Sequence, residues 1–151
     1  MKSKLIWSIF WALVGVFVVI ICTMLIPAVR ELLMGFLFII ISGAVFLSLG
    51  VALIFLTVKE RVGGTLMKFL ILTGASAAGF FVFVLLHNVF YGLGIEISHI
   101  VVLSQSMEVL HIVFFCLAVF VCPLGFLVGV VGSIVLAIKR SRVARKSLTS
   151  P

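Results

Sequence analysis

The feature that most constrains this chain is an apolar run from Leu32 to Val58 that no charged residue interrupts. A helix needs about 20 predominantly apolar residues to cross the hydrocarbon core of a bilayer, so this run is long enough to span it with tilt. Three further runs of this kind occupy residues 5–26, 66–93 and 109–138. The sequence therefore predicts an all-α, polytopic membrane protein built as a four-transmembrane-helix bundle.

Composition supports this prediction. Only 10% of the residues are charged and 65% are hydrophobic, whereas a soluble globular domain carries about 25% charged residues. Four spans and their short connections take up residues 1–138, and a basic tail occupies residues 139–151. We therefore expect one helical bundle with a cytoplasmic tail and no soluble domain.

The first run is predicted to be a span and not a cleaved signal peptide. It follows Lys2 and Lys4, but it is longer than the 7 to 15 residues of a typical signal-peptide core, and no A-x-A cleavage site follows it. The cysteines, Cys22, Cys116 and Cys122, all lie in apolar runs without a CxxC pair. We expect them to be free thiols that pack as small hydrophobic side chains.

The distribution of positive charge predicts the orientation of the chain. Ten of the eleven Lys and Arg residues fall on one side of the four predicted spans, and Arg30 alone falls on the other. By the positive-inside rule, both termini are cytoplasmic in a multi-pass protein of the cell membrane. The net charge of +7 then indicates contact with anionic lipid at the tail, not with nucleic acid.

All three histidines lie between His87 and His111, on the predicted outer side. Counting about 20 residues from Phe69 brings the third span out near Asn88. Counting back from Lys139 along the fourth span leaves His111 at the same interface. Residues 94–108 are predicted to form a short interfacial or partly re-entrant connector, and Pro123 is predicted to kink the fourth span.

Two Glu-x-x-His pairs in this stretch are the sharpest chemical pattern in the chain. Residues three apart on a helix share a face, and such pairs supply half of a carboxylate-bridged di-metal site. A single metal ion needs fewer ligands. The candidate ligands are His111, Glu108, His99, Glu96 and His87. Two alternatives stay open: a haem held between His87 and His111, and a hydrated loop that binds nothing.

Small residues indicate where the spans pack. The fourth span carries His111, Ala118, Cys122, Gly125, Gly129 and Gly132 along one stripe, and the third carries Gly74, Ala78, Phe81, Leu85 and Asn88. Small residues allow the close approach that helix association in lipid requires. We expect packing within the bundle, with contact between copies of the chain as the alternative.

The residues that other classes of function require are missing from the sequence. A transporter needs ionisable groups at mid-membrane, and the first two spans contain none. No GxSxG, HExxH or nucleotide-binding loop is present, and Asp is absent. The sequence favours a non-enzymatic accessory subunit or scaffold without a cofactor, with a membrane or protein partner. The alternative is a metal- or haem-binding redox protein that uses the outer histidines and glutamates.

Three segments carry a resemblance to known sequences. They are residues 70–80 (LILTGASAAGF), 87–93 (HNVFYGL) and 122–129 (CPLGFLVG). In these the chain resembles a group of small, uncharacterised prokaryotic membrane proteins with four predicted spans. The resemblance covers about residues 66 to 138; it implies the topology and supplies no mechanism.

Overall fold

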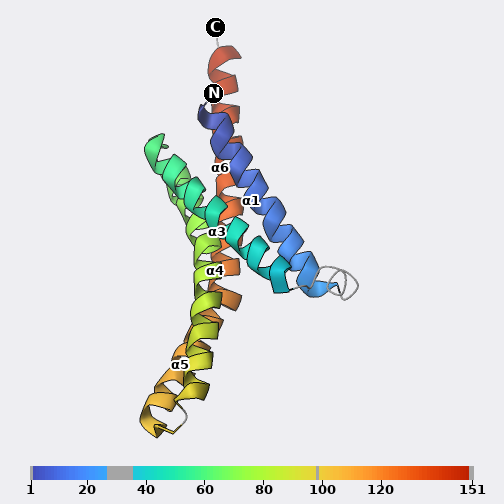
Figure 1. Ribbon diagram of the computed structural model, residues 1–151. Helices are drawn as coiled ribbons and strands as arrows, with labels where there is room; N and C mark the ends of the chain where they lie inside the picture. Colours follow the sequence, from blue (N-terminus) through green and yellow to red (C-terminus); the bar gives the residue numbers. More distant parts are fainter. Residues whose placement is uncertain (1, 27–35, 98, 150–151) are drawn as a thin grey trace.

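A computed structural model describes residues 2–26, 36–97 and 99–149 of the chain (Figure 1). The described residues are helical almost throughout and include no strand. Four stretches of helix are long and apolar enough to cross a membrane. This confirms the predicted all-α bundle of four spans. Residues 27–31, which connect the first two predicted spans and include Arg30 and Glu31, lie outside the described residues.

The first two membrane helices match their predicted positions closely. α1 is Lys2–Leu25 and α3 is Phe36–Lys59. α3 is followed by a turn in which Arg61 has φ 50° and Gly64 has φ 73°, a left-handed backbone conformation that glycine adopts without strain. α4, the central helix, is Thr65–Glu96 and packs against α3, α5 and α6.

The last part of the chain differs from the prediction. α5 (Val101–Cys116), a π-helical turn η1 (Leu117–Val121) and α6 (Cys122–Thr149) follow one another without a break. The connector after α4 is therefore confined to residues 97–100, and the predicted 94–108 connector is wrong. The fourth helix also continues through the basic tail to Thr149, because the tail holds no Gly or Pro before residue 151 that would end it.

The irregular turn lies where Pro123 was predicted to kink the helix. Pro123 has no N–H, and in a regular α-helix its ring would clash with the carbonyl of Val119. In η1 the bonding widens by one residue, and the Cys122 N–H donates to the Leu117 carbonyl oxygen. A π-turn of this kind is one of the recognised ways in which a helix accommodates such a defect.

Glycines set the distance between the membrane helices. A Cβ at Gly50 of α3 would lie 2.7 Å from the Gly74 carbonyl oxygen of α4, and a Cβ at Gly129 of α6 would lie 2.8 Å from the Thr73 backbone nitrogen. The two predicted stripes therefore pack within the bundle. They do not meet each other: the Gly74 stripe faces α3, and the Gly125–Gly132 stripe faces Phe69, Thr73 and Ser76 on a second side of α4.

The core lies toward the end of the molecule that holds both termini (Figure 1). One cluster of buried side chains comprises Ile6, Phe10, Leu53, Leu66 and Leu70, and a second comprises Leu13, Phe46, Ala77 and Phe126. At the opposite end, α1 and α3 diverge from the α4–α5 pair, which extends beyond them (Figure 1).

Candidate functional site

Two of the five predicted site residues lie side by side. The ring centroids of His87 on α4 and His111 on α5 are 5.3 Å apart, with the rings tilted by 44°. Eleven residues separate His87 from Ser76, so the two lie within about 20° of each other around α4. His87 therefore occupies the side of α4 that meets α5 and α6, and the two histidines lie at the same level of the bundle.

A hydrogen bond fixes the protonation pattern of His87. Its Nδ1 lies 3.0 Å from the backbone carbonyl oxygen of His111. A carbonyl oxygen only accepts, so Nδ1 is the donor. In the neutral imidazole the proton therefore sits on Nδ1, and Nε2 carries the free lone pair.

The other predicted ligands are more dispersed. Glu108 and His111 line a small hollow between α4 and α5 together with Tyr91, whose ring centroid is 5.5 Å from that of His111. Glu96 and His99 are exposed near the α4–α5 turn. Among residues 2–26, 36–97 and 99–149, no three His, Cys, Asp or Glu side chains are grouped as a metal site. The two imidazole rings also touch, which leaves no gap between them for a haem.

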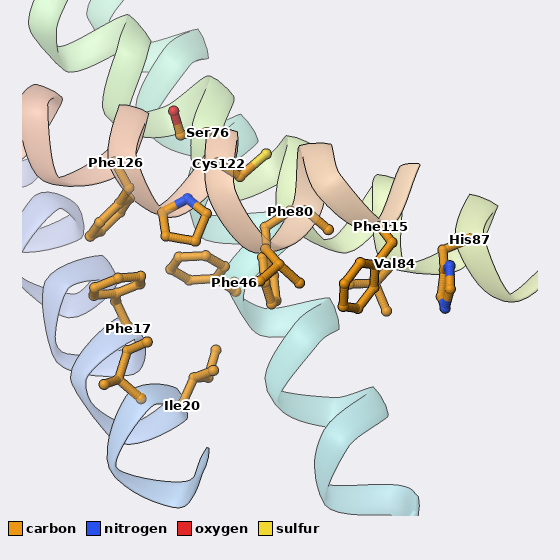
Figure 2. Close-up of a pocket in the computed structure, with 14 residues that line it drawn as sticks. Phe17, Ile20, Phe46, Ser76, Phe80, Val84, His87, Phe115, Cys122 and Phe126 are labelled. Atoms are coloured by element: carbon orange, nitrogen blue, oxygen red, sulfur yellow. The ribbon is translucent and has the colours of Figure 1, made fainter. Parts of the chain in front are cut away.

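The largest feature near His87 is an apolar cavity of about 460 Å³. It lies between the α1–α3 pair and the helices α4, α5 and α6, and Figure 2 shows His87 at one end of the row of lining side chains. Most of the lining is aliphatic or aromatic. The lining residues are Phe17, Ile20, Ile21, Phe46, Ser76, Phe80, Val84, His87, Phe115, Ala118, Val119, Cys122, Pro123 and Phe126.

Aromatic packing forms the inner wall of the cavity. The rings of Phe17 and Phe126 stack with centroids 4.4 Å apart, and Phe46 lies 5.5 Å from Phe126 and 6.2 Å from Phe80. These rings come from α1, α3, α4 and α6, so they hold the four helices together where the cavity ends. At the other end of the cavity, the His87 ring packs on Phe115 with centroids 5.3 Å apart.

The irregular turn forms another wall. Ala118 and Val119 of η1 and Pro123 at the start of α6 all line the cavity. Backbone irregularities of this type are frequent at functional sites. Here η1 shifts the register of α5 relative to α6, so that Phe115 and Phe126 both face the same space.

The polar groups in the cavity wall are few and separate. Ser76 is 9% exposed, and its Oγ lies against Gly125, 2.6 Å from where a Cβ would be. Cys122 is 5% exposed. His87 lies about 16 Å from Ser76 along α4 by helical rise, so it cannot act as the base for that hydroxyl. The cavity is therefore apolar along most of its length, with His87 at one end.

Sequence reasoning located His87 but missed the cavity. The lining comes from six helical elements, and only their arrangement in space reveals it. Pro123 within a membrane helix was the one signal in the sequence that marked this region. The chain matches no protein-family model, no curated protein and no solved structure in the comparisons made.

Proposed function

We propose that this protein is a non-enzymatic multi-pass protein of the cell membrane, with both termini cytoplasmic, that binds one hydrocarbon chain in the cavity beside α4. The observation that carries this proposal is the cavity itself. Its volume of about 460 Å³ falls within the range of small-molecule sites, which are lined mostly by apolar side chains with a few polar groups.

The dimensions suit a lipid chain. A water-sized group takes about 30 Å³ of liquid volume, so the cavity has room for on the order of 15 methylene-sized groups. The cavity runs along α4 from Ser76 to His87, about 16 Å by helical rise. This is about half of a hydrocarbon core of about 30 Å, which is the depth of one leaflet.

The basic end supports the proposed orientation. Lys59, Lys139 and Arg142 are exposed at the end of the bundle where both termini lie (Figure 1). At a cytoplasmic surface these charges would contact anionic head groups. His87 would then lie at the outer interface, and the cavity in the outer leaflet. In this role the protein serves as an accessory subunit or scaffold that presents or retains a lipid.

Photolabelling of the full chain in nanodiscs tests the binding. A hexadecyl probe with a diazirine near its end should crosslink to cavity residues, which peptide mapping would identify. Val84→Trp fills the cavity and should reduce labelling at least severalfold. Val82→Trp adds the same ring at a 41% exposed position of α4 outside the cavity, and should leave labelling unchanged. Equal labelling in the wild type and both variants would refute the proposal.

Metal binding at His87 and His111 is a second candidate. The contact between the two rings favours it, as does the Nδ1–H bond that orients His87, because metal-ligating histidines are held in this way. Glu108 on the turn before His111 is the nearest further ligand on α5. Protein purified with zinc should then hold one ion per chain, and His111→Ala should lose it. A metal-free wild-type sample would exclude this candidate.

A further inference from the structure

The polar end of the cavity carries information about its occupant. His87 is the lining residue whose side chain carries nitrogens that can form hydrogen bonds, and it lies at the end of the cavity (Figure 2). Ser76, at the other end, directs its hydroxyl toward Gly125 in the α4–α6 interface. A head group of the occupant would therefore meet His87, while the chain would lie among the phenylalanines.

The hydrogen bond from His87 to the His111 carbonyl determines which hydrogen-bonding group this head group must carry. Nδ1 is committed as a donor to a carbonyl oxygen of α5, and that carbonyl belongs to the backbone, so no side-chain change on α5 releases it. Nε2 of the neutral ring then accepts one hydrogen bond and donates none. A head group that only accepts, such as an ether, ester or ketone, finds no partner there.

We infer that the occupant is a single-chain amphiphile whose head group carries an O–H donor, as in a long-chain alcohol, and that Nε2 of His87 accepts this bond. The inference rests on the proposed function, since it concerns the same cavity. It adds the chemical class of the ligand and makes His87 the residue that selects it. His111 contributes its backbone carbonyl, which positions His87, and its side chain plays no part in this selection.

Competition against the photoprobe tests the selection. The competitors are 1-hexadecanol and hexadecyl methyl ether, which have the same chain and differ in the O–H donor. A hydrogen bond contributes about 0.5 to 1.5 kcal/mol net, so in the wild type the alcohol should compete about 3- to 10-fold better than the ether. His87→Phe keeps a ring against Phe115 and should make the two competitors equal.

His111→Phe is the matched control. It removes the neighbouring imidazole but keeps the backbone carbonyl to which His87 donates, so the preference for the alcohol should persist. If the His111→Phe variant lost the preference for the alcohol over the ether, the proposed role of the backbone hydrogen bond would be overturned. Equal competition in the wild type, with both compounds displacing the probe, would overturn the inference and leave the hydrocarbon site intact. Displacement by neither compound would refute the proposed function.

Nitrogen NMR of histidine tests the inference on the wild-type protein, so the test does not depend on whether a variant folds. In wild-type protein labelled with ¹⁵N-histidine, His87 should show a protonated Nδ1 and an unprotonated Nε2. Addition of 1-hexadecanol should shift the Nε2 resonance of His87, and the ether should not. A protonated Nε2 in the neutral ring, or an equal shift with both compounds, would contradict the inference.

Discussion

Replacing Gly50 with alanine should separate α3 from α4 and destabilise the bundle. A Cβ at this position would lie 2.7 Å from the Gly74 carbonyl oxygen and 3.0 Å from the Ala78 backbone nitrogen, whereas ordinary contact begins at 3.4 Å. The nearest contact is therefore 0.7 Å too short. Both atoms belong to the backbone of α4, so no side-chain rotation relieves the clash and the helices themselves must move.

The size of the effect follows from what holds helices together in lipid. Lipid chains are as apolar as leucine, so association depends on close van der Waals packing. A gap of 0.5 to 1 Å already forfeits a quarter to a half of the dispersion energy of each contact. We expect Gly50→Ala to lower the free energy of unfolding by about 1–3 kcal/mol, the range of overpacked cores.

The assay is SDS titration of the full chain in bicelles, followed by tryptophan fluorescence. Trp7 is a suitable reporter, because its ring lies 5.2 Å from Phe10 in the core. Gly15→Ala is the matched control: a Cβ there meets nothing within 4 Å, so it should leave stability unchanged or raise it by up to about 1 kcal/mol. Wild-type stability in Gly50→Ala would show that the close approach of α3 and α4 is not required.

Three other predictions concern the α6 interface, the basic end and the topology. Gly129→Ala should lower the free energy of unfolding more than Gly132→Ala in the same titration. A Cβ at Gly129 meets the Thr73 backbone at 2.8 Å, whereas a Cβ at Gly132 meets the ring of Phe69, which can rotate. Equal losses of unfolding free energy in the two variants would contradict this prediction. Arg140→Ala removes an exposed hydrogen bond of 2.7 Å to the Gly63 carbonyl and should change stability by less than about 1 kcal/mol; a larger loss would mean that this contact holds α6 to the α3–α4 turn. A fluorescent protein fused after Pro151 should be fluorescent and alkaline phosphatase fused there inactive, and the opposite pattern would reverse the proposed orientation.

The spans could be predicted from the sequence because hydrophobic length is a local property. Residues 5–26 and 66–93 fall within one to three residues of α1 and α4 at each end. The start of the fourth helix could not be predicted in this way. Ser104 and Ser106 look like loop residues, but in α5 the Ser106 hydroxyl donates to the Val102 carbonyl four residues earlier, which is compatible with a helix.

The assignment of helix faces needed the structure for a different reason. A stripe of small residues shows that a face packs, but not against which helix. α4 packs on two sides at once: Gly74 meets Gly50 of α3, and Thr73, the preceding residue, meets Gly129 of α6. His87 lies off the Gly74 stripe, on the other packed side of α4, against His111.

The cavity follows from a conflict between two local requirements. Close packing at Gly50 and Gly129 holds α3 and α6 tightly against α4 in the half of the bundle near the termini. In the other half, Pro123 widens the helix into the η1 turn, and the fourth helix continues along α4 as α5 while α1 and α3 diverge (Figure 1). Tight contact at one end and divergence at the other leave a wedge that the lining side chains do not fill. An apolar space that opens toward the hydrocarbon core of a bilayer would be reached by lipid chains, and this is the reason for our proposal that a hydrocarbon chain occupies it with its head at His87.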